Sequence, residues 1–458
     1  MQRIVVIGGV AAGLKAAAKV RRLDAEAQIT VLERGELVSY GACGLPYFIG
    51  GEVEQVRQLM SSPSGTLRTP EFFKKAKNLD VLTRMEAVAI EREAKIVHAL
   101  NLETGAKQQF AYDKLVLATG ASPLKPAWPG VEKENIFHVW RPQDAAAIRR
   151  GLETQKYEKA VVIGAGLIGL EIAEALRMWD VDVTVVEMKN QLFPALLDED
   201  MAQELELSLA AKGLQFLKEE AVEAFGGDAQ VREVKTDKRT LTADLVILAL
   251  GARPNVELAR QAGLEIGTSG AIAVNEYLQT SDKAIFAGGD CAENTHRVSG
   301  EKVFLPMGST ANKHGRVIGE NLCGAGVKFG GVLGTAAVKL FEMQVGRTGL
   351  NERQGAAAGF ECVSVTVAGY DRPHYMKAAR KVLLKLTADA VSRQLLGMQA
   401  WGEGDVVKRV DVAAMALSLG ATVDKLFDAD LAYSPPFNSP IDMLAVAANK
   451  LTAKLGRC

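Results

Sequence analysis

The chain has 458 residues, of which 48% are hydrophobic and 24% are charged. This length predicts two or three packed domains rather than one small one. Lysine and arginine number 54 against 55 aspartates and glutamates, and this balance provides no general attraction to nucleic acid or to an anionic membrane. The apolar stretches, such as residues 160–170, are shorter than a membrane span.

Cysteine usage indicates a reducing compartment. The five cysteines are widely spaced and form neither a Cys-x-x-Cys pair nor a cluster with histidine. This pattern argues against a secreted disulfide framework and against a metal site, and it predicts a cytoplasmic protein. The last of them, Cys458, is expected to be an inert thiol at the chain terminus.

The first 33 residues carry a nucleotide-binding pattern. A β-branched run over residues 3–7 predicts a buried strand, a glycine-rich turn and a helix follow, and a second strand over residues 28–32 ends at Glu33. In such a βαβ unit the turn and the helix N-terminus hold a pyrophosphate, and the acid, here 25 residues after Gly8, receives ribose hydroxyls. Val10 stands where the usual G-x-G-x-x-G pattern has its middle glycine, so this copy is imperfect.

A second and complete copy begins 156 residues after the first. A strand over residues 160–163 leads into Gly164-Ala165-Gly166-Leu167-Ile168-Gly169, the full fingerprint, and the following strand ends at Glu187. Because both copies have the strand, turn, helix and strand that the motif requires, the pair is a stronger signal than either copy alone. Two dinucleotide sites in one chain predict electron transfer between a nicotinamide and a flavin.

Three further apolar strands end at glycines, over residues 115–120, 245–251 and 284–290. Each is expected to pass close to a dinucleotide, because ligands of open α/β sheets bind beyond the carboxyl ends of the strands. The third ends in Gly288-Gly289-Asp290, where the acid can hydrogen-bond a cofactor hydroxyl or can simply cap a turn.

With these motifs in this order, the sequence resembles the pyridine nucleotide–disulfide oxidoreductases over nearly its whole length. The resemblance implies an α/β fold with two Rossmann-like dinucleotide-binding domains and a C-terminal α+β dimerisation domain. It divides the chain into residues 1–150 (first part of the FAD-binding domain), 151–275 (NAD(P)H-binding domain), 276–325 (return segment of the FAD-binding domain) and 326–458 (dimerisation domain).

The resemblance also implies the cofactor contacts. Glu33 should bind the FAD ribose, Asp290 the ribityl chain, and Glu187 the ribose of the nicotinamide cofactor. A carboxylate at that last position repels a 2′-phosphate and favours NADH, while the nearby Lys189 leaves NADPH possible. The residues assigned to the two cofactors are Gly8, Ala11, Ala12, Gly13, Glu33, Arg34, Ala87, Ala118, Thr119, Gly120, Asp290, Ala311, Gly164, Gly166, Leu167, Ile168, Gly169, Glu187 and Gly251.

The segment over residues 39–47 contains the predicted redox centre, Cys43. Relatives of the glutathione-reductase type have a second cysteine five positions later, where this chain has Phe48, so a dithiol relay within the segment is excluded. A lone thiolate can carry a mixed disulfide, a persulfide or a sulfenic acid. A helix start and a bound flavin are expected to lower the pKa of Cys43, and we interpret it as catalytic rather than as a buried structural cysteine.

This segment resembles the single-cysteine branch that contains coenzyme A-disulfide reductases, NADH-dependent persulfide or polysulfide reductases, and NADH oxidases and peroxidases. Oxidase and peroxidase members carry a histidine in the first glycine turn, and the turn over residues 9–13 has none. We therefore predict an FAD-dependent NAD(P)H enzyme that reduces coenzyme A disulfide, coenzyme A persulfide or polysulfide. An NADH oxidase or peroxidase that uses a sulfenic acid, and a flavin electron-transfer or redox-sensing protein, are the alternatives.

Coenzyme A, as substrate or as bound thiol, carries phosphates that require cations. For Lys15 a solvated helix face is the plainer interpretation, and at Lys313 the family usually has arginine. The resemblance assigns the substrate contacts to Lys15, Arg22, Ser39, Lys75, Asn312 and Lys313.

The C-terminal third has β-branched runs and an alanine-rich helix without a nucleotide fingerprint. The resemblance implies that it forms a homodimer and covers the active site of the partner subunit. It implies that Tyr433 and a second tyrosine reach the active-site cysteine of the partner subunit. The motif that carries the second tyrosine has diverged in this chain. We assign Tyr375 to that position, and Tyr370 stays an alternative.

Overall fold

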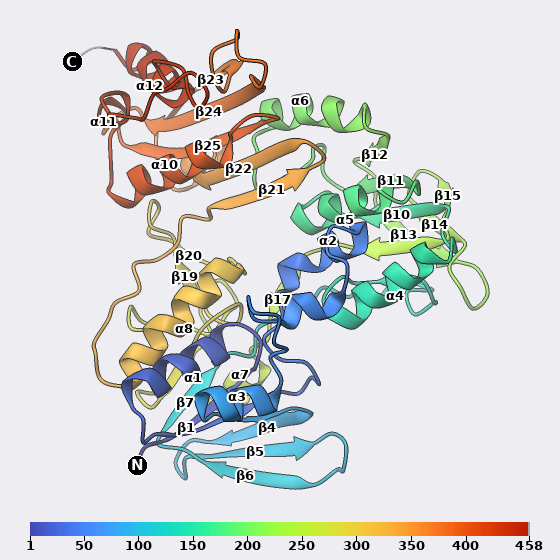
Figure 1. The fold of residues 1–458 in the computed structure, drawn as a ribbon, viewed down its shortest axis with the longest axis vertical. Helices are drawn as coiled ribbons and strands as arrows, with labels where there is room; N and C mark the ends of the chain where they lie inside the picture. Colours follow the sequence, from blue (N-terminus) through green and yellow to red (C-terminus); the bar gives the residue numbers. More distant parts are fainter. Residues whose placement is uncertain (457–458) are drawn as a thin grey trace.

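The computed structural model describes residues 1–456, in which the chain forms three regions (Figure 1). The first is drawn in blue and cyan, and the chain returns to it in yellow; the second is green, and the third is orange and red. Cys458 lies outside the described residues. None of the helices described combines the length and the apolar character that crossing a membrane requires.

The first region is built on a parallel sheet with the strand order β18-β7-β1-β2-β3. Its β-branched residues are buried on both faces, as a parallel sheet between covering layers requires. The strands are β1 (Arg3–Ile7), β2 (Gln28–Leu32), β3 (Asp80–Leu82), β7 (Lys114–Leu117) and β18 (Ile285–Ala287). Because β18 comes from far along the chain, residues beyond the second region complete the first sheet.

Two helices, α1 (Ala12–Leu23) and α8 (Gly308–Leu322), lie side by side over this sheet (Figure 1). Glycines allow their backbones to approach closely. A Cβ added at Gly315 would lie 2.5 Å from the carbonyl oxygen of Ala12, and one at Gly319 would lie 2.9 Å from that of Ala16. The N-termini of both helices consequently point toward the same end of the sheet, where the nucleotide turn lies.

Smaller elements complete the first region. An antiparallel sheet of β4, β5 and β6 is joined to it, and α2 extends toward the second region, where it packs against α5. The bounds are η1 (Ala42–Gly44), α2 (Leu45–Gly50), η2 (Val56–Met60), α3 (Pro70–Lys77), β4 (Met85–Glu91), β5 (Ile96–Asn101), β6 (Lys107–Ala111), β8 (Ala121–Pro123), β17 (Ala252–Pro254), α7 (Glu257–Gln261), β19 (Asn294–Thr295) and β20 (Lys302–Val303).

The second region repeats the same plan with a parallel sheet in the order β12-β11-β10-β16-β9. Strand β9 precedes residue 150, the predicted end of the first part of the FAD-binding domain, but it pairs with β16 of the second region. The domain limits themselves stay a prediction. The bounds are β9 (Ile136–Phe137), α4 (Pro142–Glu153), β10 (Lys159–Ile163), α5 (Leu167–Arg177), β11 (Asp182–Glu187), α6 (Glu199–Ala210), β12 (Leu214–Lys218), β13 (Val222–Gly226), β14 (Glu233–Thr236), β15 (Thr240–Thr242) and β16 (Leu245–Leu248).

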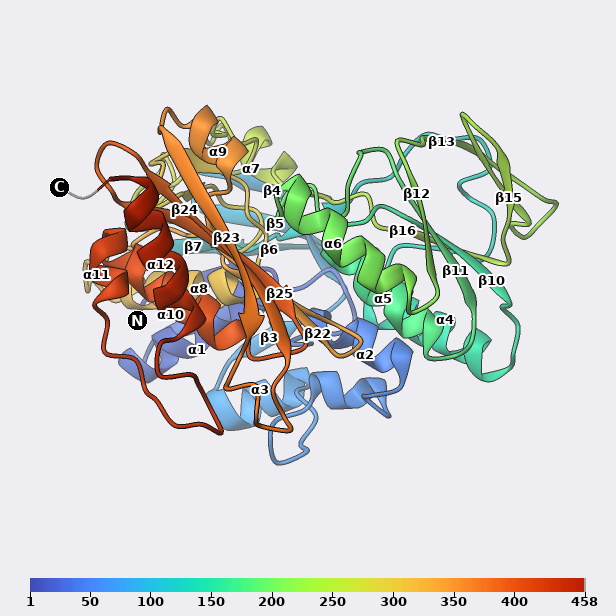
Figure 2. The same cartoon turned by 90° about the horizontal axis from the view of Figure 1, so that it is seen from above.

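The third region is an antiparallel sheet in the order β21-β22-β25-β24-β23, with α10 and α12 packed on it (Figure 2). The bounds are β21 (Ala336–Leu340), β22 (Met343–Gly349), α9 (Glu352–Ala357), β23 (Cys362–Tyr370), β24 (Lys381–Asp389), β25 (Leu395–Gly402), α10 (Val407–Ser418), α11 (Val423–Phe427) and α12 (Met443–Lys454). The predicted fold class, two parallel-sheet regions followed by an α+β region, is confirmed.

Buried charges join the third region to the second. The ammonium of Lys385 on β24, only 5% exposed, pairs with Asp198 at 3.1 Å and with Asp200 at 2.9 Å. Gln399 on β25 donates to the carboxylate of Asp198 at 2.7 Å and accepts from its amide. These contacts fix the segment before α6 against the antiparallel sheet.

Candidate functional site

The two predicted nucleotide turns have the same hydrogen-bonding geometry. The carboxylate of Glu33 accepts from the backbone amide of Gly9 at 2.7 Å. Glu187 likewise accepts from the amide of Ala165 at 2.8 Å. In each unit the acid at the end of the second strand is thereby held above the turn after the first strand, which is the position from which a carboxylate receives ribose hydroxyls.

Each turn also requires glycine at its first position. A Cβ at Gly8, whose φ is +113°, would lie 2.0 Å from the carbonyl oxygen of Ala118. The corresponding atom at Gly164, with φ +107°, would lie 2.4 Å from that of Ala249. The strands that end at residues 117 and 248 therefore cross directly beside the turns, as predicted for the glycine-ended strands.

Open space lies where a pyrophosphate would be held. A Cβ at Gly166 would meet no heavy atom within 4 Å. The helices α1 and α5 begin at these turns without a side-chain cap, so their first amide groups are available to an anion. Leu167 and Ile168 form the first turn of α5, and Ile168 is exposed. The residues present thus fit a dinucleotide at each turn.

The third glycine-ended strand brings Asp290 to the N-termini of α1 and α8. Gly289, with φ +79°, lies so close that its Cβ would be 3.1 Å from the Cβ of Ala12 and 3.8 Å from that of Ala311. Burial raises the pKa of the Asp290 carboxyl. The backbone before Asp290 thus lies against the first turns of both helices, near the nucleotide turn for which FAD is predicted.

The remaining predicted cofactor residues are spread over several elements of the first two regions. Thr119 donates its hydroxyl to the carbonyl of Asn255 at 2.7 Å, and Asn255 returns a hydrogen bond to the carbonyl of Thr119 at 2.8 Å. The others in the first region lie after β2, in β4, directly before α1, on α1 or in the loop after β7, and Gly251 follows β16: Arg34, Ala87, Ala11, Gly13, Gly120 and Gly251.

Cys43 lies in the 3₁₀ turn η1, directly before α2, and is an exposed free thiol. A Cβ on Gly308, the first residue of α8, would be 3.8 Å from its Sγ. The thiol is thus beside the N-terminus of a 15-residue helix. The segment is tied to the first nucleotide turn, because the amide of Ser39 donates to the carbonyl of Gly9 at 2.9 Å.

The protein groups around Cys43 act on its pKa in the direction opposite to that expected for a helix start with a bound flavin. Partial enclosure by the surrounding protein raises the pKa of the thiol, and the negative charges of Glu171 and Asp290 raise it further. These charges come from α5 and from the loop after β18, so the thiol lies between the second nucleotide unit and the return segment of the first region. The helix end favours the thiolate, but burial and the two carboxylates outweigh it.

A polar cluster beside the cysteine was not predicted from the sequence. The hydroxyl of Tyr47 on α2 donates to Glu171 on α5 at 3.3 Å. Burial raises the pKa of Glu171 to about 7 and that of Tyr47 to about 12. Lys339 on β21 adds contacts to Glu174 at 3.0 Å and to Glu52 at 2.7 Å. The signal that could have found Glu171 is its place in the second turn of α5 (Leu167–Arg177), the helix that follows the second fingerprint.

Cations gather between α1 and α3. Burial lowers the pKa of Lys77, and the positive charges of Arg22, Arg68 and Lys15 lower it further. Lys75 stands on the same helix as Lys77 and is exposed. The structure therefore brings the predicted cations Arg22 and Lys15 near Lys77 and Arg68, which the sequence analysis had not selected.

The two predicted substrate residues on α8 have different surroundings. Asn312 donates to the carbonyl of Gly308 at 2.9 Å, so its side chain turns back toward the helix N-terminus. Lys313 lines a cavity of about 290 Å³ between α8 and α10, together with Arg297 and Met415.

The predicted tyrosines lie on the third region. In the single chain Tyr433, Tyr375 and Tyr370 are 50%, 64% and 45% exposed. Tyr370 ends β23, while Tyr375 lies in the loop between β23 and β24. Their approach to Cys43 of the partner subunit stays a prediction.

Comparison with known proteins agrees with these features. The family description "Pyridine nucleotide-disulphide oxidoreductase" matches residues 2–312, and its dimerisation domain matches residues 335–445. The chain is 37% identical over 450 residues to the NAD(P)H coenzyme A polysulfide/persulfide reductase of Pyrococcus horikoshii, with 98% of each chain covered. It is 32% identical over 453 residues to an NADH oxidase of Methanocaldococcus jannaschii, with 99% of each covered.

Among solved structures, the NAD-dependent persulfide reductase from A. fulgidus superimposes with a TM-score of 0.97 at 43% identity. The match covers 99% of this chain and 83% of that one. The family that the sequence motifs indicated is confirmed, and this family implies FAD and NAD(P)H as cofactors. The chain belongs to the pyridine nucleotide-disulphide oxidoreductase family.

Proposed function

We propose that the protein is an FAD-dependent NAD(P)H oxidoreductase that reduces coenzyme A persulfide, coenzyme A disulfide or polysulfide through Cys43. The observation that carries this proposal is the position of that thiol. It is free and exposed, it lies beside the N-terminus of α8, and it is close enough to Asp290 and Glu171 for their charges to act on it. A single sulfur between two nucleotide units is suited to exchange with an external sulfur compound.

The chemistry requires the Cys43 thiolate, so the thiol, whose pKa the protein raises, first gives its proton to water. The thiolate attacks one sulfur of a coenzyme A disulfide, forms a mixed disulfide and releases one coenzyme A thiolate, which takes up a proton. With a coenzyme A persulfide, attack at the inner sulfur forms the same mixed disulfide and releases hydrosulfide. Bound FAD would supply the two electrons, taken as hydride from NAD(P)H, that return the mixed disulfide to the Cys43 thiolate and a coenzyme A thiolate.

The residues of the two turns would hold the cofactors. Glu33 and Asp290 would bind hydroxyl groups of FAD, and Glu187 those of the nicotinamide cofactor. Both oxygens of Glu187 accept backbone amides, from Ala165 at 2.8 Å and from Lys189 at 2.9 Å, so the carboxylate is fixed over the turn. A fixed negative charge there supports a preference for NADH over NADPH.

The cations between α1 and α3 would bind the phosphates of coenzyme A. Arg22, Lys15 and Lys75 are the residues selected from the sequence, and Lys77 adds a positive charge near Arg22 and Lys15. Ser39, Asn312 and Lys313 would contact the remainder of the molecule. Because coenzyme A carries several phosphate charges, such a cluster supports a coenzyme A compound over a small neutral oxidant.

The active enzyme would be a cytoplasmic homodimer in which each third region covers the Cys43 of the partner subunit. The matching dimerisation domain supports this assembly. Tyr433 and Tyr375, exposed in the single chain, would then donate a proton or a hydrogen bond to the departing thiolate.

Replacement of the cysteine tests the proposal. Cys43→Ser should abolish NADH-driven turnover of coenzyme A disulfide and persulfide while FAD stays bound. Cys323→Ser, which changes another exposed free thiol on the return segment, is the matched control and should retain full activity. Undiminished turnover in Cys43→Ser would refute the mechanism. Coenzyme A attached to Cys43, seen in the mass of the purified protein, would support it.

The relative named NADH oxidase makes oxygen or peroxide reduction the second function to test. Its sulfenic acid chemistry would need an acid–base group near Cys43, and the turn over residues 9–13 offers no histidine. Rates with oxygen and peroxide should therefore be far below those with the sulfur compounds. High rates on small sulfur compounds without an added protein would also exclude a role as an electron carrier to a protein partner.

A further inference from the structure

The tyrosines of the third region depend on their backbone for position. Tyr433 precedes a turn at residues 434–438, and Tyr375 lies in the loop over residues 371–380. About half or more of each side chain is exposed in the single chain, so packing of the rings cannot fix them. The contacts that hold the two loops consequently decide where the tyrosines point.

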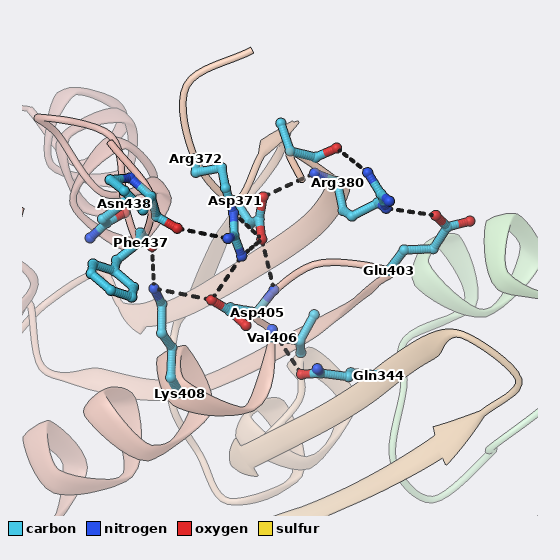
Figure 3. A network of polar contacts seen from close by, with 12 residues as sticks. Gln344, Asp371, Arg372, Arg380, Glu403, Asp405, Val406, Lys408, Phe437 and Asn438 are labelled. Atoms are coloured by element: carbon cyan, nitrogen blue, oxygen red, sulfur yellow. Dashed lines mark hydrogen bonds and ion pairs between the residues drawn. The ribbon is translucent and has the colours of Figure 1, made fainter. Parts of the chain in front are cut away.

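Asp371 closes the first loop from inside the protein. Its side chain is fully buried, and its carboxylate accepts the backbone amides of Arg380 at 3.0 Å and Asp405 at 3.2 Å (Figure 3). Its own amide donates to the carbonyl of Arg380 at 2.9 Å. Both ends of the loop that carries Tyr375 are thus joined at one carboxylate.

The same carboxylate is ionised although it is buried. Burial opposes the charge of Asp371, but hydrogen bonds from the guanidinium of Arg372 and from the two amides outweigh it and lower the pKa of Asp371. Arg372 donates to Asp371 at 2.7 Å and also to Asp405 at 3.2 Å. Gly404 makes room for this arrangement, because a Cβ there would lie 2.7 Å from the Cβ of Asp371.

The network continues into the second loop through backbone carbonyls. Arg372 donates to the carbonyl of Pro436 at 2.7 Å, and Lys408 on α10 donates to that of Phe437 at 2.7 Å (Figure 3). Asn438 donates to the carbonyl of Ala432, directly before Tyr433, at 3.2 Å. Side chains of the network therefore satisfy carbonyls on both sides of that tyrosine.

The buried side chain of Arg409 contacts both loops. It is 2% exposed, and its guanidinium donates to the carbonyl of Asp371 at 2.9 Å and to the side chain of Asn438 at 3.1 Å. Asp442 at the start of α12 neutralises it at 2.8 Å. One buried cation thus contacts the residue after Tyr370 and the residue that supports Tyr433.

We propose that Asp371, Arg372 and Arg409 are positioning residues that hold the two tyrosine-bearing loops as one rigid unit over the partner's active site. The inference rests on the proposed function, in which those tyrosines reach Cys43 of the partner subunit. Buried ion pairs contribute little net stability compared with apolar residues of the same size. Here their donors are directed at the carbonyls beside the tyrosines, which is what precise placement of a reacting group requires.

The test is Asp371→Asn, which keeps the shape of the side chain and removes its charge. We expect kcat for coenzyme A disulfide reduction to fall roughly 10- to 100-fold, because misplacement of a reacting group by about 1 Å can cost ~100-fold. Reduction of the flavin by NADH, followed anaerobically, should be unchanged, since the loops lie on the third region. Asp424→Asn is the matched control: it makes the same change on α11, where Asp424 forms an ion pair with Arg393, and it should leave both rates intact.

A double-mutant cycle separates positioning from general destabilisation. If Asp371 acts through the tyrosines, Asp371→Asn should slow the Tyr433→Phe, Tyr375→Phe protein much less than it slows the wild type. Equal slowing in both backgrounds, or a loss of flavin reduction as well, would overturn the inference. If Asp371→Asn does not form a dimer, Arg372→Gln, a change at a side chain that is 17% exposed, takes its place with the same expected outcomes.

The outcome for the tyrosines alone distinguishes the two proposals. Unchanged sulfur-compound turnover in Tyr433→Phe, Tyr375→Phe would contradict the role that the proposed function gives to these residues. Slow turnover in that protein combined with normal turnover in Asp371→Asn would contradict only the positioning role.

Discussion

Tyr47 on α2 donates its hydroxyl to the carboxyl group of Glu171 on α5 at 3.3 Å. This contact joins the helix that follows Cys43 to the helix that begins at the second nucleotide turn. Glu171 also acts on the thiol, since its charge raises the pKa of Cys43. The protonation of one carboxyl group is therefore linked both to the thiol and to the contact between the two regions.

Glu171 should make stability fall as pH rises toward neutrality. Burial raises its pKa to about 7, so the folded protein holds this proton more tightly than the unfolded chain, in which a glutamate has a pKa of about 4.3. The free energy of unfolding should then decrease between about pH 4.3 and about pH 7 and level off above. Glu171→Gln should remove this slope in urea melts of the purified holoenzyme.

The control for this prediction is Glu204→Gln, which changes an exposed glutamate on α6. It should retain the pH dependence of the parent protein. If Glu171→Gln and the control have the same slope, the carboxyl group is not the source of the pH dependence.

The glycines of the second fingerprint should separate cofactor binding from folding. Gly166→Ala places its Cβ in open space at an extended backbone, whereas at Gly169 a Cβ would lie 2.0 Å from the carbonyl oxygen of Gly164. Gly166→Ala should leave the thermal midpoint of unfolding unchanged. It should weaken the binding of NADH about tenfold, because the added methyl group obstructs the phosphate site. Gly169→Ala should lower the free energy of unfolding by about 1–3 kcal/mol.

Fluorescence titration with NADH and thermal melts would measure both effects. Wild-type affinity for NADH in Gly166→Ala would show that the open space above the turn does not hold the cofactor phosphates.

The cations of α1 and α3 should set the KM for coenzyme A compounds. Arg22→Gln combined with Lys77→Gln removes two neighbouring positive charges. Because each contact between a cation and a phosphate at the surface is worth up to about 1 kcal/mol, the KM for coenzyme A disulfide should rise about 5- to 20-fold. The KM for NADH and the rate with inorganic polysulfide should not change.

A matched surface change tests whether the effect is local. Lys107→Gln on β6 removes an exposed cation outside α1 and α3 and should not alter any KM. An equal rise in the KM for polysulfide, which lacks the nucleotide phosphates, would contradict a phosphate-binding role for the cluster.

Much of the site could be predicted from short segments. The turn at Gly8 folds as a nucleotide turn even though Val10 replaces the middle glycine, because the close approach to Ala118 involves the first glycine. The contact of Gly9 with Glu33 follows from the length of one helix and one strand. The direction in which the protein shifts the pKa of Cys43, by contrast, depends first on enclosure of the thiol and then on two carboxylates from distant segments, which its own segment does not reveal.

The amino-acid sequence by itself determined the family, the two nucleotide units and the single thiol, because each depends on residue types at fixed spacing within one strand–turn–helix segment. Only the tertiary structure decided which charges surround that thiol and how the tyrosine loops are held. Lys339 meets Glu174 from another region, and Arg409 joins Asp371 to Asn438 across three separate stretches of chain. Such contacts depend on burial and on the approach of residues far apart in sequence, and no local pattern records either.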